Sequence, residues 1–227
     1  MRYILLIISF INLSWTQVGA GMFSSKNESI IGIEGTYDNE EISGGSMSSI
    51  AISGSYVLNG NLEFIIGYVM GETKNDDDSS LDFDTDGFLF GGNYHIKENE
   101  QLPFNIKLGG FYGDAKMSAD WLDDLDVSIK TNASGLGAGI YKNVYQEGNT
   151  TIIGFFDFLS VTSETKISVG NAVETDKYDV NQTNFGLAIR NRNIFISPSI
   201  TRGDGESDFS ITFGLLLPQK INIIENY

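Results

Sequence analysis

The strongest constraint on this chain is a two-residue alternation of apolar with polar or small side chains, which recurs along most of its length. It is cleanest over residues 209–217, where phenylalanine, isoleucine or leucine occupies every second position. Beyond residue 28, no long segment repeats its apolar residues at the 3.6-residue period of a helix. Because successive side chains of a strand point to opposite faces of a sheet, the pattern predicts an all-β fold.

The connections between the alternating segments are of two kinds, which follow one another in turn along the chain. The short turns lie near 58–61, 97–103, 146–149 and 190–193. The longer, acidic connections lie near 38–45, 72–82, 115–127, 163–182 and 202–207. In an up-and-down sheet every second connection lies at the same end, so one end should carry turns and the other should carry acidic loops.

This reading predicts about ten strands, with eight as the alternative. Their expected ranges are 29–37, 46–58, 61–72, 82–96, 103–115, 127–144, 149–162, 183–190, 193–202 and 207–217. Most exceed the roughly 5–6 residues of soluble strands and match the roughly 9–11 tilted residues that cross a bilayer. The polar positions are rich in glycine and serine rather than lysine and glutamate, which favours a barrel whose apolar face meets lipid.

The first 20 residues have the organisation of a signal peptide. Arg2 precedes an apolar run over residues 3–13, and Val18-Gly19-Ala20 is close to the A-x-A cleavage pattern. We expect cleavage after Ala20, export through the Sec pathway, and a single barrel domain over residues 21–227. The apolar run is shorter than the roughly 20 residues of a membrane helix, so a signal anchor is the less favoured alternative.

Together, the signal peptide, the absence of cysteine, the even strand number, and the alternating turns and loops resemble a small outer-membrane β-barrel of Gram-negative bacteria, of the opacity/porin-like kind. The resemblance covers residues 29–217. It implies an up-and-down antiparallel transmembrane β-barrel in the cell outer membrane, monomeric and surrounded by lipid and lipopolysaccharide. It also implies insertion by the barrel-assembly machinery, which in such proteins often reads a terminal aromatic residue; Tyr227 is last here, but the segment after Pro218 departs from that pattern.

The polar positions of such a barrel point into its lumen. Five charged residues there are expected to form a lumen polar network: Glu34, Glu63, Lys107, Asp157 and Arg190. Side chains largely fill the interior of a barrel of this size, so we expect a structural or surface-interaction role. Two alternatives remain, a narrow porin-like channel for small solutes and a soluble, secreted, lipocalin-like binding barrel with its apolar side chains inside.

The chain is acidic, with a formal net charge of −16, which argues against nucleic acid as a partner. Asp82, Asp84 and Asp86 match the first half of a calcium-loop signature, D-x-[DN]-x-[DN]-G. The twelfth position is Asn93 instead of the bidentate Glu, and no helical pattern flanks the stretch, so an EF-hand is excluded. Weak binding of a divalent cation such as Ca²⁺ remains the metal hypothesis, a solvated acidic loop is the alternative, and no other cofactor is expected.

Catalysis is not expected. His95 is the only histidine, and it lies beside the short turn near 97–103, opposite the acidic loops. Barrels that resemble the omptin proteases carry their acid and histidine residues at the loop end. We therefore expect a structural His95 and no catalytic or cofactor-binding residues.

Overall fold

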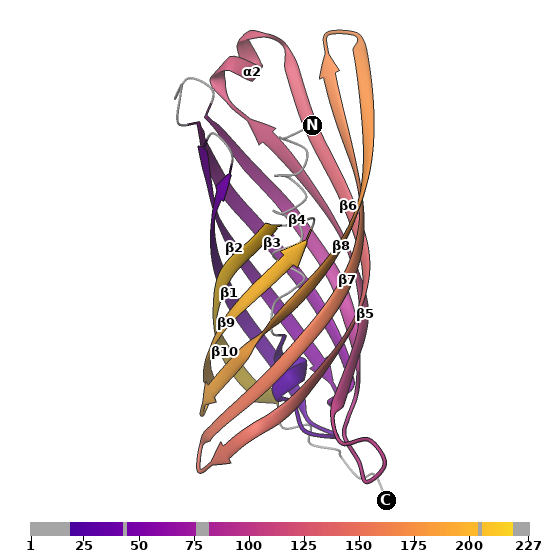
Figure 1. Cartoon of the computed structure of the whole chain (residues 1–227), viewed down its shortest axis with the longest axis vertical. Helices are drawn as coiled ribbons and strands as arrows, with labels where there is room; N and C mark the ends of the chain where they lie inside the picture. The colour runs from indigo at the N-terminus through magenta and orange to yellow at the C-terminus, as the bar shows by residue number, and fades with distance from the viewer. Residues whose placement is uncertain (1–18, 43–44, 76–81, 204–205, 220–227) are drawn as a thin grey trace, which may run out of the picture.

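Ten strands form a closed antiparallel barrel in the computed structural model, which describes residues 19–42, 45–75, 82–203 and 206–219 (Figure 1). The strands are β1 (Ser29–Ile42), β2 (Gly45–Leu58), β3 (Leu62–Asn75), β4 (Phe83–Ile96), β5 (Asn105–Ser118), β6 (Val127–Glu147), β7 (Thr150–Val169), β8 (Ala172–Asn191), β9 (Ile194–Gly203) and β10 (Glu206–Gln219). Each strand pairs with its neighbours in sequence, and β1 closes the ring against β10. The predicted up-and-down barrel of about ten strands is confirmed.

The apolar side of the wall faces outward. On β3, the side chains of Phe64 and Ile66 are 52% and 67% exposed, whereas the side chain of Glu63, on the other face of the same strand, is fully buried. Phe88 on β4 and Phe213 on β10 are likewise more than half exposed. A lipocalin-like barrel would show the opposite arrangement, with these side chains around an internal ligand. The outward arrangement is the one that a hydrocarbon surrounding requires.

Inside the barrel, phenylalanine rings lie over glycines of the neighbouring strand. The register places them opposite each other in three pairs: Phe111 with Gly135, Phe155 with Gly186, and Phe195 with Gly214. A Cβ atom built on Gly214 would lie 2.1 Å from the Phe195 ring, so no larger residue fits there without a shift of the ring. The glycine enrichment of the sequence therefore has a packing cause in this wall.

Several segments expected to be acidic loops are strands. The expected loop over 163–182 is mostly occupied by β7 and β8, which are 20 residues each and meet at a tight turn where Gly170 has a φ of +55°. Thr165, Ile167 and Val169 continue the β-branched pattern past the expected end of the strand. The expected connection over 115–127 contains a one-turn helix, α2 (Asp120–Asp124). The sequence pattern failed here because both strand faces carry polar residues where the wall leaves the bilayer.

The rim is uneven as a result. β6, β7 and β8 span 20 or 21 residues, whereas β9 spans 10. Pairing between β8 and β9 begins at Gln182 with Gly203, so residues 172–181 of β8 pair only with β7 among the described residues. In Figure 1 the β7–β8 hairpin stands well above β9 and β10. The β7–β8 hairpin, with β6 paired along β7 up to Val169, thus projects from one side of the barrel, on the rim opposite the short turns.

The ladder between β8 and β9 has a gap at Pro198. On β8, the positions paired with β9 run from Gln182 to Gly186 and resume at Ile189. Leu187 and Ala188 therefore have register partners on β7 but not on β9. Proline has no N–H to donate to the neighbouring strand. The Ser197 hydroxyl replaces part of the loss, because it donates to the Leu187 carbonyl at 2.9 Å.

No helix in the described ranges has the length and apolar character needed to cross a membrane.

Candidate functional site

The segment preceding β1 enters the barrel at the end that carries the short turns. Residues Ala20–Phe23 form a short 3-10 helix, η1, and all four residues are buried. The helix packs against β1, β2, β3 and β4, and Figure 1 shows it within the lower end of the barrel. The lumen at this end therefore contains a piece of the chain itself.

The carboxylate of Glu63 holds this segment from the wall. Its Oε1 atom accepts the backbone N–H of Gly21 at 2.9 Å. Its Oε2 atom accepts the Asn93 side-chain amide at 2.8 Å and lies 3.1 Å from Nε2 of His95. The other ring nitrogen of His95 lies 3.0 Å from the Tyr141 hydroxyl. Glu63 and His95 are both 0% exposed, so the pair lies in a buried, hydrogen-bonded cluster.

Lys97, just past the end of β4, donates hydrogen bonds to backbone carbonyl groups of the same segment. Its Nζ atom donates to the carbonyl oxygens of Gly21 and Ser24, each at 2.8 Å, and to the Tyr141 hydroxyl at 3.2 Å. Burial lowers the pKa of Lys97 to about 8, although the nearby carboxylates of Glu63 and Glu28 oppose that shift. In the folded barrel, hydrogen bonds to the N-terminal segment therefore replace part of the hydration of the Lys97 ammonium group.

Arg190 completes the attachment from the opposite wall. Its Nη1 atom donates to the Phe23 carbonyl at 3.2 Å, and its guanidinium lies 5.9 Å from the centre of the Phe23 ring. The Phe23 ring also packs against Phe195 with the ring centres 5.0 Å apart. A polar cavity of about 330 Å³ remains beside the segment, lined in part by Lys26, Asn105 and Arg190.

The five residues of the expected lumen network all lie on strands of the barrel, but they divide into separate groups. Lys107 and Asp157 form a nearly buried ion pair at 3.0 Å. Glu63 binds His95 and η1, and Arg190 binds Phe23. Glu34 is buried, and its Oε1 atom has no hydrogen-bond partner.

Sequence reasoning missed two members of the cluster, Lys97 and Tyr141. Lys97 was assigned to a surface turn, and Tyr141 falls in an expected strand range but was given no role. The bonds from Lys97 to Gly21 and Tyr141 join residues that are 76 and 44 positions apart in the sequence. The alternation could have indicated Tyr141, because this residue occupies one of the inward-facing positions of β6.

The three aspartates of the metal hypothesis lie at the opposite end. Asp82 accepts the Asn75 backbone N–H at 2.8 Å, and Asp86 accepts the Tyr68 hydroxyl at 3.2 Å. Asp84 and Asp86 stand two positions apart on β4 and share its outward face. Within the described ranges, no group of three or more His, Cys, Asp or Glu residues is placed to hold a metal ion. The cation site stays a prediction.

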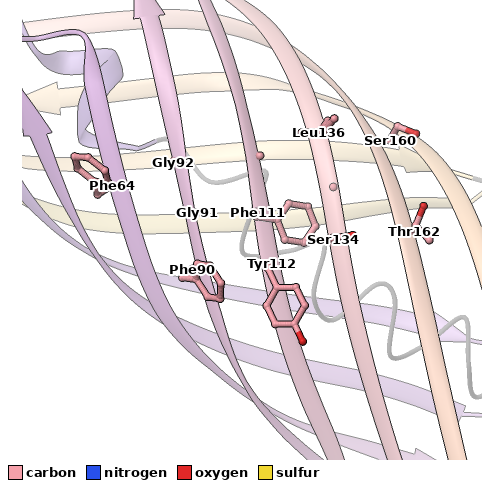
Figure 2. Close-up of a pocket in the computed structure, with 12 residues that line it drawn as sticks. Phe64, Phe90, Gly91, Gly92, Phe111, Tyr112, Ser134, Leu136, Ser160 and Thr162 are labelled. Carbon is pink, nitrogen blue, oxygen red and sulfur yellow. The ribbon is translucent and has the colours of Figure 1, made fainter.

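The outer wall carries one broad apolar groove of about 740 Å³ (Figure 2). Phe64, Phe90, Tyr112 and Leu136 border it, and all four are exposed. Glycines on three adjacent strands contribute to its floor: Gly91, Gly92, Gly110 and Gly135. The groove lies on the apolar outer face, which meets hydrocarbon in a membrane barrel.

Comparisons with known proteins agree on the architecture. No protein-family model and no curated protein matches the chain. Among solved structures, the β domain of the Bordetella autotransporter BrkA is similar with a TM-score of 0.51 and 8% identity, covering 85% of this chain and 100% of that one. The translocator domain of the autotransporter NalP from Neisseria meningitidis gives a TM-score of 0.47 and 10% identity, covering 95% of each chain. Identities this low concern the fold alone: the chain has the closed antiparallel barrel fold of Gram-negative outer-membrane proteins.

Proposed function

We propose that this protein is an integral, non-enzymatic barrel of the outer membrane, with an occluded lumen and a structural or surface-interaction role. The observation that carries the proposal is the N-terminal segment inside the lumen. Its backbone is bonded to Glu63, Lys97 and Arg190, which come from different parts of the wall. A segment held from several sides obstructs the path of a solute along the barrel axis.

The wall supports the membrane assignment. Large apolar side chains are exposed on all of the strands from β1 to β10, and the closed ring leaves no free edge within the barrel wall. Exposed apolar surface of this extent is costly in water and favourable in lipid. In this proposal, lipid and lipopolysaccharide surround a monomer that the barrel-assembly machinery inserts, and the protein binds neither nucleic acid nor a resident cofactor.

The surface-interaction role rests on the β7–β8 projection. Its strand β8 pairs with β9 only from Gln182 onward, and residues 172–177 near the tip of the hairpin are exposed. Glu164 forms ion pairs with Lys166 at 3.2 Å and with Lys177 at 3.0 Å across the hairpin. Charged side chains protect an exposed strand edge from indiscriminate pairing, which suits a surface that meets partners selectively.

Planar bilayer recordings test the occlusion. We expect the wild-type protein to give no discrete conductance steps, because the N-terminal segment crosses the lumen. A variant with Lys97→Ala and Arg190→Ala removes two of the attachments and should give brief openings. Lys26→Ala and Arg192→Ala together remove the same charge from exposed positions and should remain silent. Regular steps from the wild type would favour the narrow channel over the occluded barrel.

A further inference from the structure

We propose that the barrel interior is a binding site for the α-ammonium group of its own mature N-terminus, with Glu63 and Glu34 as the carboxylates that receive it. The inference rests on the proposed export and on cleavage after Ala20. Hydrolysis by a signal peptidase adds water across the Ala20–Gly21 amide: the hydroxyl joins the Ala20 carbonyl carbon and the C–N bond breaks. The Gly21 nitrogen takes up protons and becomes an ammonium group.

The Gly21 nitrogen already lies at a carboxylate. Its single amide hydrogen points to Glu63 Oε1 at 2.9 Å, in a position without access to solvent. An ammonium group at the same atom offers three donors and a positive charge. A charge-assisted bond is stronger than the neutral one it replaces, and more so in a dry interior.

The second carboxylate, Glu34, has an oxygen atom nearby that can accept a further hydrogen bond. Glu34 is 3% exposed, its Oε1 atom has no partner, and its remaining hydrogen bond is to the Ala20 backbone. A Cβ atom built on Gly32 would lie 2.9 Å from the Ala20 Cβ and 3.3 Å from Glu34 Oε1, which places the carboxylate beside the cleavage point. Departure of Ala20 removes this partner of Glu34, and the new ammonium supplies another.

The charge balance favours the same assignment. Glu34 and Glu63 are both buried, and each negative charge disfavours the other. The groups that face them are His95, Lys97, Lys107 and Tyr141. His95 is paired with Glu63, Lys107 with Asp157 and Lys97 with the backbone of the segment, which leaves Glu34 without a paired cation among these groups. Buried carboxylates need a paired cation or they lose their charge. The α-ammonium adds that cation next to both of them.

The identity of residue 21 is a separate line of support. A Cβ atom built on Gly21 would lie 2.1 Å from His95 Nε2, so only glycine fits between the histidine and Glu63. Signal peptidase selects small residues before the cut and does not require glycine after it. The need for glycine at the first mature position therefore comes from the barrel interior.

Mature protein isolated from outer membranes gives the first test. Mass spectrometry of its N-terminal peptide should show a chain that begins at Gly21. Any other N-terminus overturns this inference while leaving the occluded barrel intact. Failure of the protein to reach the outer membrane would instead overturn the proposed function, and the inference with it.

Chemical labelling then tests the contact itself. An acylating reagent that is selective for α-amines should label the folded wild-type protein at least about tenfold more slowly than the Glu63→Gln variant, a factor that corresponds to a shift of about one pKa unit. The Glu34→Gln variant should also accelerate labelling. The matched control is Glu164→Gln, the same chemical change at the opposite rim, which should leave the rate at the wild-type value. Folding of every variant is checked by its heat-dependent electrophoretic mobility.

A two-residue insertion keeps the test decisive even where a carboxylate variant fails to fold. Two serines between Ala20 and Gly21 leave the cleavage sequence intact and move the ammonium away from Glu63, while Gly21 keeps an amide N–H. We expect rapid labelling of this variant and a lower midpoint of urea unfolding. Equal labelling rates for the folded wild type and the insertion variant would overturn the proposal.

Discussion

At the scale of single residues, the interior of this barrel is fitted more tightly than its exterior. Gly214 and Gly21 each face an atom that a Cβ would approach to 2.1 Å, in one case the Phe195 ring and in the other His95. Gly35, on the outward side of β1, has only one backbone oxygen near that position, at 4.0 Å. The same glycine-to-alanine substitution should therefore cost stability on the inner face and have little effect on the outer face.

The Gly214→Ala substitution should lower the free energy of unfolding by about 1–3 kcal/mol, the usual cost of overpacking. The physical reason is that the Phe195 ring, 1% exposed, must move to make room. Urea titration in lipid vesicles measures the change. Gly35→Ala is the matched control on an adjacent strand and should change stability by less than about 0.5 kcal/mol. An equal loss in both variants would contradict the tight interior contact.

Lys97 predicts a pH dependence of stability. Its pKa falls from 10.5 in the unfolded chain to about 8 in the folded barrel, mainly because of burial. Between these values the unfolded chain binds more protons, so the stability of the folded barrel should rise with pH through this window and level off above it. Below pH 8 both states are protonated, and the burial cost is constant.

The measurement is urea unfolding in vesicles at a series of pH values through that window, for the wild type and for Lys97→Met. The variant keeps the apolar stem and removes the titrating group, so its stability should lack the wild-type rise. A control, Lys26→Met, removes an exposed lysine of the same segment and should retain the rise. Identical profiles for all three proteins would show that Lys97 is not the group responsible.

At the scale of strands, the alternation of the sequence was enough to divide the side chains between two faces and to predict about ten strands, because side-chain direction in a strand depends on parity alone. Which face is outward follows from the burial of the side chains in the closed barrel. It was not enough to locate strand ends. The extension of β7 and β8 through residues 163–182 lies beyond the apolar band, where both faces carry polar residues and the alternation disappears. The attachment of η1 was also not predictable from the pattern, since Gly21 and Lys97 are 76 residues apart in the sequence.

The orientation of the barrel can be read from cysteine labelling, because the chain has no cysteine of its own. Val173→Cys lies at the exposed start of β8, on the projection, and should react with a membrane-impermeant maleimide on intact cells. Glu100→Cys lies in the exposed β4–β5 turn at the other end and should react only after the outer membrane is permeabilised. The reverse pattern would place the projection in the periplasm.

At the scale of the whole molecule, the closed ladder should make the barrel resistant to detergent. All ten strands are hydrogen-bonded to two neighbours, so no strand can detach without loss of pairing on both sides. Unheated samples in sodium dodecyl sulfate should therefore migrate at a different position from boiled samples. Sodium carbonate washing should leave the protein with the membrane pellet. A single band in both samples, or recovery in the aqueous fraction, would contradict an embedded barrel.

The interruption of the hydrogen-bond ladder at Pro198 weakens the wall of the barrel between β8 and β9. Two rungs are missing between β8 and β9, and a single hydroxyl bond from Ser197 spans the opening. Bending the cylinder along this seam breaks fewer bonds than bending it along the uninterrupted ladder between β7 and β8. The tall and short sides of the rim meet at the same seam, so we expect bending of the wall to concentrate between the projection and β9.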